Sequence, residues 1–246
     1  MATYVISDIH SHLSVLKDFL KDITEEDRVI CLGDTIDKGP DGIRVLNLIR
    51  NDPRFTLLMG NHELMMLQFL MAEYNLQHLP KGSLTTRLRY LKAYKEMEML
   101  WLDWNDGMRT LRDFQSLSAE EQNDIHLYLY NLPVLMQLEV NQRQFVLVHS
   151  YPARIADRPY LYYEEVKDHI NDFVWARDPY CKVEGKIVIV GHTIVQYEFR
   201  KDEVETDGEW YDIDLGLAMD CSLSKLAVLK LDDLSVRYYP LVKQNR

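Results

Sequence analysis

Short runs of consecutive apolar residues recur along the chain, and each ends at a polar residue or at a glycine that precedes one. These runs occupy residues 4–6, 29–32, 57–59, 145–148 and 187–190. Apolar runs without alternation are typical of strands that are covered on both faces. Because ligands bind outside the carboxyl ends of strands in open α/β sheets, we expect the polar residues that follow these runs to meet in one crevice.

The first 70 residues alternate the predicted strands with segments of helical spacing. Apolar positions share one helical face at Leu13, Leu16, Phe19 and Leu20, and another at Ile43, Leu46 and Ile49. A third helix is predicted to begin near Glu63 and to run through Phe69. This alternation of strand and helix predicts a parallel sheet with right-handed crossovers.

Between residues 71 and 132 the pattern is helical, and none of the runs that end in polar residues falls there. We predict a single domain over residues 1–246, in which residues 71–132 form a helical insertion that caps the site. The aromatic residues Trp101, Trp104, Tyr128 and Tyr130 belong to this segment. They either face a substrate or pack the core of the insertion, and general burial tendencies favour packing.

Strand patterns return after Pro133. A hairpin is predicted at residues 134–140 and 144–148, and further short strands at residues 195–200, 210–213, 225–231 and 236–241. We expect these strands to form a second, mostly antiparallel sheet that packs against the first. The predicted fold class is therefore α/β, with two sheets in a β-sandwich, helices outside them (αββα) and a helical insertion.

Composition and charge narrow the classes of function. The chain has 39 acidic and 28 basic residues, and its formal net charge is -11. This balance argues against a broad surface for nucleic acid or anionic membranes. A small anionic substrate stays compatible with it, because bound metal ions reverse the local charge. Three widely spaced cysteines, the absence of a basic, apolar leader and the absence of a membrane-length apolar run lead us to expect a cytoplasmic protein.

The residues that follow the predicted strands form a set of potential metal ligands. In chain order they are Asp8 and His10, Asp34 and Asp37, Asn61, His62 and Glu63, then His149, then His192. Nitrogen and oxygen ligands without a thiolate suit divalent manganese, iron or zinc. If one carboxylate is shared, such a set fits a two-metal centre, in which ions about 3.5–4 Å apart clamp an in-line displacement at phosphorus.

These fragments also have a recognisable order. Asp8-Ile9-His10 is followed by Gly33-Asp34-Thr35-Ile36-Asp37-Lys38-Gly39 and by Gly60-Asn61-His62-Glu63. His149, Trp175-Ala176-Arg177, Gly191-His192-Thr193 and Ile213-Asp214-Leu215-Gly216 extend the series through the second half of the chain. Taken together, the series resembles the phosphoprotein phosphatase family of calcineurin-like metallophosphoesterases, of the bacterial serine/threonine phosphatase type.

The resemblance implies a role for each site residue. Asp8 and His10 would hold one metal ion, Asp34 would bridge both ions, and Asn61, His149 and His192 would hold the second. His62 would be the general acid that protonates the leaving alkoxide, and Asp37 would orient it. The alternative for His62 is a histidine that only supports the ligands or caps a helix.

Lys38 and Arg177 would bind the phosphate group of the substrate, as the resemblance implies. Arg177 can grip two phosphate oxygens with its planar guanidinium. Lys38 departs from the family pattern, in which arginine is usual. Lysine keeps the charge but loses the bidentate geometry, which leaves the preference among substrates open. Tyr151 lies two residues after His149, and it either lines the pocket or packs in the core.

The function that we predict is metal-dependent hydrolysis of phosphate monoesters, above all phosphoserine and phosphothreonine in proteins, by direct attack of a metal-bridging hydroxide. The expected cofactors are two divalent ions, manganese ahead of iron or zinc. The first alternative is a symmetrical dinucleoside tetraphosphatase or another nucleotide phosphohydrolase. The second is a non-catalytic phosphate-binding module, although a binder needs no general acid. The expected partner is a phosphorylated protein or small phosphoester, neither nucleic acid nor membrane, and the oligomeric state stays open.

Overall fold

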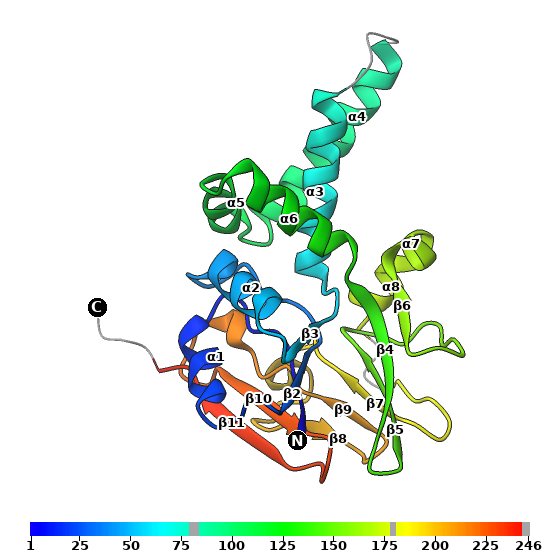
Figure 1. The fold of residues 1–246 in the computed structure, drawn as a ribbon. Coiled ribbons are helices and arrows are strands. Elements are labelled where there is room, and N and C mark those ends of the chain that lie inside the picture. The colour runs from blue at the N-terminus through cyan, green and yellow to red at the C-terminus, as the bar shows by residue number, and fades with distance from the viewer. Residues whose placement is uncertain (79–83, 178–180, 243–246) are drawn as a thin grey trace.

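The protein folds as two β-sheets that pack face to face, with helices on the outside, as the computed structural model shows (Figure 1). The structure describes residues 1–78, 84–177 and 181–242. One sheet has the order β11-β10-β1-β2-β3 and the other β6-β4-β5-β7-β9-β8. The predicted fold class, a two-sheet sandwich flanked by helices, is therefore confirmed.

The first sheet consists of β1 (Thr3–Ile6), β2 (Arg28–Cys31), β3 (Phe55–Leu57), β10 (Lys225–Lys230) and β11 (Val236–Pro240). The second consists of β4 (Pro133–Val140), β5 (Arg143–Val148), β6 (Tyr160–Tyr162), β7 (Ile187–Val190), β8 (Glu205–Thr206) and β9 (Trp210–Asp212). Alternate side chains of each strand point to opposite faces. Val5, Ile30, Phe145 and Ile189 thus fill the core between the sheets, whereas their chain neighbours pack under the helices.

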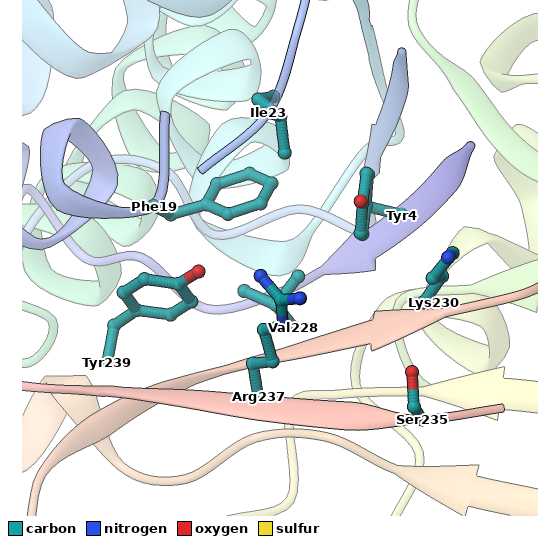
Figure 2. Close-up of a pocket in the computed structure, with 8 residues that line it drawn as sticks. All are labelled: Tyr4, Phe19, Ile23, Val228, Lys230, Ser235, Arg237 and Tyr239. Carbon is teal, nitrogen blue, oxygen red and sulfur yellow. The ribbon is translucent and has the colours of Figure 1, made fainter. Parts of the chain in front are cut away.

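Helices α1 (Leu13–Leu20) and α2 (Gly42–Asn51) connect the parallel strands β1, β2 and β3, as predicted. Figure 2 shows where α1 meets the sheet. The ring of Phe19 lies edge-on to Tyr4 and Tyr239, with ring centroids 5.8 and 5.7 Å apart. This contact fixes α1 on the outer face of the first sheet.

A largely helical segment follows β3. It contains α3 (Asn61–Gln77), α4 (Leu84–Met97), the π-helix η1 (Glu98–Asp103), α5 (Met108–Gln115) and α6 (Ala119–Tyr130). Figure 1 shows α3 and α4 projecting together away from the sheets. Helix α6 begins as predicted, because Ser118 and Glu121 satisfy each other's backbone N–H groups in a capping box. We propose that residues 71–132 are an insertion in the sandwich.

The remaining short helices lie in the second half of the chain: α7 (Tyr163–Val166), η2 (Lys167–His169), α8 (Ile170–Val174), α9 (Val195–Glu198) and η3 (Leu217–Met219). Helix α9 shows that the predicted strand at residues 195–200 is wrong. After β7 the chain turns away from the sheet, and β9 pairs with β7 instead of residues 195–200. The Val195 N–H bonds to the carbonyl of Asp214, which follows β9. Among the described residues, no helix is both long and apolar enough to cross a membrane.

The second sheet differs from the prediction in its membership, whereas most of its pairings are antiparallel, as predicted. Strands β10 and β11 belong to the first sheet, where β10 pairs antiparallel with β1. Three pairings of the second sheet are antiparallel, but β5, β7 and β9 run parallel. Partners that lie more than 200 residues apart leave no local signal. The parallel strands matter for the site, because they direct the ends of β5 and β7 to the same edge.

Candidate functional site

The six predicted metal ligands follow the ends of strands from both sheets. Asp8 and His10 follow β1, Asp34 follows β2, Asn61 follows β3, His149 follows β5 and His192 follows β7. Each is buried, with at most 6% of its surface exposed. Backbone hydrogen bonds hold the loops together, such as the one from the His10 N–H to the Asp34 carbonyl (2.9 Å). The structure therefore brings all six side chains into one buried region.

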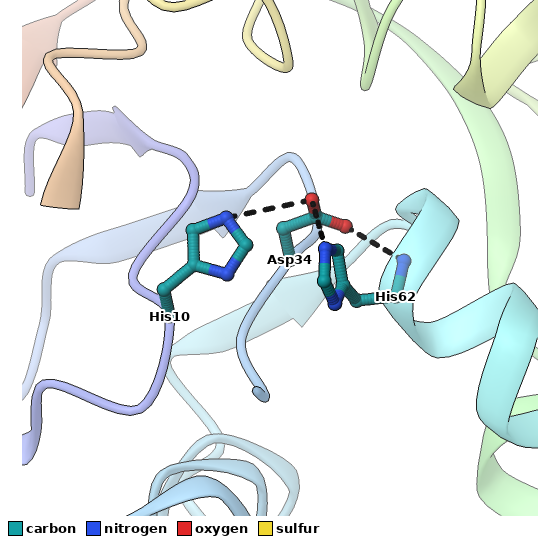
Figure 3. Close-up of side chains that lie close together, drawn as sticks. All are labelled: His10, Asp34 and His62. Carbon is teal, nitrogen blue, oxygen red and sulfur yellow. Dashed lines mark hydrogen bonds and ion pairs between the residues drawn. The ribbon is translucent and has the colours of Figure 1, made fainter. Parts of the chain in front are cut away.

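Asp34 lies at the centre of this group, and Figure 3 shows it between His10 and His62. Its Oδ2 atom lies 3.6 Å from His10 Nε2 and 3.8 Å from His62 Nε2. Its Oδ1 atom lies 3.5 Å from His149 Nε2 and accepts a hydrogen bond from the His62 N–H (3.0 Å). Asn61 Oδ1 contacts His149 Nε2 at 3.0 Å. Both carboxylate oxygens of Asp34 thus face imidazole nitrogens.

The donor atoms form two clusters that share Asp34. One contains His10, Asp34 and His62, the other Asp34, His149 and His192, and the ligand atoms within each lie within 4.8 Å of one another. His192 Nε2 is buried without a hydrogen-bond partner among the described residues, as expected of a nitrogen that binds a cation. The residues present therefore fit a pair of divalent ions.

The charge states of the imidazoles support the same fit. Burial and the neighbouring His62 lower the pKa of His10 to about 3. Burial and the neighbouring His149 lower the pKa of His192 to about 2, so both rings are neutral at pH 7 and able to bind metal. Burial also lowers the pKa of His149, but the Asp34 carboxylate outweighs it and raises the value to about 9. The region attracts positive charge, which a metal ion can supply.

The backbone of the site is strained, and two glycines allow its close contacts. Asp8, His10, Asp34 and His192 have φ angles of 52°, 44°, 55° and 66°, in the left-handed region that few residues other than glycine adopt. A Cβ atom on Gly191 would lie 2.2 Å from Asp8 Oδ2, and one on Gly60 would lie 2.2 Å from Asp34 Oδ1. Such strain persists only where surrounding contacts hold it, and it concentrates at functional sites.

Glu63 holds the loop that carries Asp34. Its Oε2 atom accepts hydrogen bonds from the N–H groups of Asp34 (2.8 Å) and Gly60 (3.1 Å). Its Oε1 atom accepts from the N–H and hydroxyl of Thr35, at 2.8 and 2.7 Å. Glu63 was among the polar residues that follow the predicted strands, but no role was predicted for it.

His62 and Asp37 form the predicted pair. His62 Nδ1 lies 2.7 Å from Asp37 Oδ2, and both side chains are buried. Burial lowers the pKa of His62, but the charges of Asp34 and Asp37 and the hydrogen bond to Asp37 outweigh it, so the pKa is raised. Because Nδ1 is engaged by Asp37, Nε2 is the nitrogen that can carry a proton towards a substrate or bind a cation.

Among the described residues, two further side chains donate hydrogen bonds to the Asp37 carboxylate, and neither contact was predicted from the sequence. Trp101 Nε1 donates to Asp37 Oδ2 (2.8 Å), and the Thr110 hydroxyl donates to Asp37 Oδ1 (2.5 Å). They come from η1 and α5, and no pattern around either residue signals a contact with Asp37. Trp104, by contrast, is 65% exposed. Of the two tryptophans weighed between facing a substrate and packing the insertion, Trp101 packs in the core and Trp104 does not.

The two predicted phosphate-binding cations lie beside the ligand loops. Lys38 follows Asp37 and has its Nζ atom 3.3 Å from Asp106 Oδ2. Arg177 donates from Nη1 to the His192 carbonyl (3.3 Å). Tyr151 packs against the main hydrophobic core, in agreement with the packing alternative.

Comparisons with known proteins agree with this geometry. The model of the family described as calcineurin-like phosphoesterase matches residues 1–196. The chain is 27% identical over 208 residues to serine/threonine-protein phosphatase 2 of Salmonella typhimurium. The matched region covers 79% of this chain and 80% of that protein. It is 34% identical over 82 residues to the symmetrical bis(5'-nucleosyl)-tetraphosphatase of Nitrosomonas europaea, covering 32% of this chain and 31% of that protein.

A solved structure supports the fold. The metallophosphoesterase from Sphaerobacter thermophilus superposes with a TM-score of 0.53 at 17% identity, over 99% of this chain and 90% of that one. The family model spans most of the chain and every predicted metal ligand. The chain therefore belongs to the calcineurin-like phosphoesterase family and is a phosphatase-like hydrolase with a metal-binding site.

Proposed function

We propose that the protein is a metal-dependent phosphomonoesterase that acts on phosphoserine and phosphothreonine in proteins. The observation that carries the proposal is the buried His62–Asp37 pair beside Asp34. An alkoxide of serine or threonine is a poor leaving group, and a positioned acid accelerates its departure by about 10²–10⁴. The serine/threonine-protein phosphatase of Salmonella also matches over most of its length, which supports this substrate class.

In this proposal Asp8, His10, Asp34, Asn61, His149 and His192 hold two divalent ions. When bound, such ions stabilise charge on phosphoryl oxygens and lower the pKa of a coordinated water. Asp34 suits the shared position, because each of its oxygens faces a different imidazole cluster. We propose manganese, since the set of carboxylate, amide and imidazole ligands suits hard to borderline cations.

His62 delivers the proton. Asp37 accepts from Nδ1 and so fixes the ring, with Nε2 as the atom that would donate the proton to the leaving oxygen. Lys38 beside Asp37 and Arg177 beside His192 would attract the phosphate dianion. Lys38 exchanges its contact with Asp106 for the phosphate, which costs little because Asp106 is mostly exposed.

A symmetrical tetraphosphatase is the second candidate, because the relative in Nitrosomonas europaea shares part of the chain at a higher identity. The leaving group of that reaction is a nucleoside diphosphate. The pKa of its protonated form is far below the pKa of a serine or threonine alcohol. A buried acid pair contributes little to such a reaction. The His62–Asp37 pair therefore favours the phosphomonoesterase.

The test compares kcat/KM of the manganese-loaded protein for a phosphoserine peptide and for diadenosine tetraphosphate. We expect faster hydrolysis of the peptide. Preference for the dinucleotide would establish the second candidate, and hydrolysis of neither would indicate a phosphate-binding module. Asp34→Asn, which removes the shared carboxylate, is the control for contaminating phosphatases. A cytoplasmic setting is part of the proposal, since the few cysteines are widely spaced.

A further inference from the structure

In the part of the chain that the structure describes, three side chains donate hydrogen bonds to the Asp37 carboxylate, and His62 is one of them. The other two donors are Trp101 Nε1 (2.8 Å) and the Thr110 hydroxyl (2.5 Å). All three donors are nearly inaccessible to solvent: His62 is 3% exposed, Trp101 0% and Thr110 2%. Trp101 and Thr110 follow Asp37 by 64 and 73 residues, so the helical segment is what brings them to the site.

Trp101 and Thr110 each pack against a glycine that leaves room for the side chain. A Cβ atom on Gly107 would lie 2.5 Å from Trp101 Nε1, so the indole packs directly against a glycine backbone. A Cβ atom on Gly42 would lie 2.9 Å from the Thr110 hydroxyl. Trp101 belongs to the π-helix η1, and π-helical turns are frequent at functional sites.

The three hydrogen bonds use both carboxylate oxygens of Asp37. Oδ2 accepts from His62 and Trp101, whereas Oδ1 accepts from Thr110. Thr110 also accepts from the Asp37 N–H (3.3 Å), which ties side chain and backbone together. Because rotation of the carboxylate would break the bonds to Trp101 and Thr110, these residues fix the oxygen that orients the His62 ring. A group placed this accurately needs such a supporting layer.

We propose that Trp101 and Thr110 are positioning residues for proton transfer from His62, so that the helical segment takes part in the reaction through Asp37. The inference rests on the proposed function, because it assumes that His62 is the acid. The same segment reaches the phosphate-binding loop a second time through Asp106 and Lys38. The helical segment thus contacts the loop at both Asp37 and Lys38.

The test uses two substrates that differ in their need for an acid. Phenyl phosphate has a poor leaving group, and 2,4-dinitrophenyl phosphate has a good one. We expect Trp101→Phe and Thr110→Val to lower kcat on phenyl phosphate by about 10-fold, a fraction of the full contribution of a general acid, with KM unchanged. On 2,4-dinitrophenyl phosphate kcat should stay within a factor of about two, since departure of that group needs little help.

Matched variants separate positioning from damage to the fold. Thr110→Ser keeps the hydroxyl and should retain the activity that Thr110→Val loses. Trp104→Phe makes the same change at an exposed tryptophan of the same segment and should leave both substrates unaffected. Equal losses on both substrates, or no loss on either, would overturn the inference.

A readout without turnover completes the test. In the metal-free protein labelled with ¹⁵N-histidine, the Nδ1 proton of His62 reports its hydrogen bond to Asp37. Trp101→Phe should shift this resonance, whereas Trp104→Phe should not, and neither should alter manganese affinity measured by calorimetry. His62→Asn distinguishes the two levels of the argument. If its loss is equal on both substrates, the acid assignment fails; if only the Trp101 and Thr110 variants lack the leaving-group dependence, the inference alone fails.

Discussion

Glu63 offers the strongest test of how the fold supports the site, through the conservative change Glu63→Gln. The glutamate accepts four hydrogen bonds, two on each oxygen, and it is fully buried. Glutamine replaces one acceptor oxygen with an NH₂ donor. If the NH₂ group faces Thr35, the hydroxyl can rotate to accept, and the Thr35 N–H alone is left unpaired. The opposite orientation leaves the N–H groups of Asp34 and Gly60 unpaired, so the first is preferred.

The magnitude follows from this count. One buried N–H without a partner costs about 1–3 kcal/mol, and the remaining bonds weaken because the acceptor has lost its charge. We expect Glu63→Gln to lower the free energy of unfolding by about 2–4 kcal/mol, a large part of the roughly 5–15 kcal/mol of a typical domain. Manganese affinity should fall as well, since the loop of Asp34 loses its anchor.

Urea unfolding of the metal-free protein measures the first effect, provided the m-value is unchanged. Calorimetric titration with manganese measures the second. The matched control is Glu121→Gln, because Glu121 holds the same position in the capping box of α6 and accepts from the Ser118 N–H at the exposed surface. Only a small change is expected there. Equal effects of the two substitutions would refute the reasoning from burial.

Three further predictions concern the ligands and the acid. Gly191→Ala should weaken manganese binding, because its Cβ atom would lie 2.2 Å from Asp8 Oδ2; Gly185→Ala, whose Cβ atom meets nothing within 4 Å, should leave the affinity measured by calorimetry unchanged. Asp34→Asn should reduce the manganese bound per chain in metal analysis, and a full content of metal would show that Asp34 is not shared. The pKa of His62 is raised, so kcat should fall at alkaline pH as His62 loses its proton. Asp37→Asn removes a charge that raises this pKa and should move the alkaline fall of kcat to lower pH. An alkaline fall that stays at the same pH would contradict the pairing of His62 with Asp37.

The strand-end ligands could be predicted because local sequence carries all the information that they need. A buried strand, a turn and a polar side chain are adjacent in the chain around Asp8, Asp34 and Asn61, so position in sequence gives position at the sheet edge. Glu63 was within reach of the same logic. It is the third residue of α3 and bonds back to the Gly60 N–H as the glutamate of a capping box does, although Gly60 lacks the N-cap side chain of the usual signature.

Other features depend on partners that no local pattern specifies. The pairing of β10 with β1 joins the two ends of the chain, and the predicted strand at residues 195–200 is instead the helix α9. Trp101 was weighed as facing a substrate or packing the core of the insertion; it packs in the core and also bonds to Asp37. Its ring packs on Phe69 with centroids 5.3 Å apart, while its Nε1 atom bonds to Asp37. Apolar burial and polar contact in one side chain cannot be separated by pattern alone.

The site combines features that oppose folding, and its surroundings explain how they persist. Buried carboxylates and imidazoles lie close together on backbone with positive φ angles, and both features cost free energy. Glu63 offsets part of this cost through four hydrogen bonds to the loop, and the Asp37 carboxylate is held by three side-chain donors. These hydrogen bonds do not remove the cost of burying charge. Burial raises the pKa of Asp8 to about 6, so a nearby cation would stabilise its carboxylate. Divalent ions should therefore stabilise the folded protein in proportion to the logarithm of their concentration once it exceeds their dissociation constant. Bound divalent ions would thus add to the stability that hydrogen bonds already give the five strand-end loops.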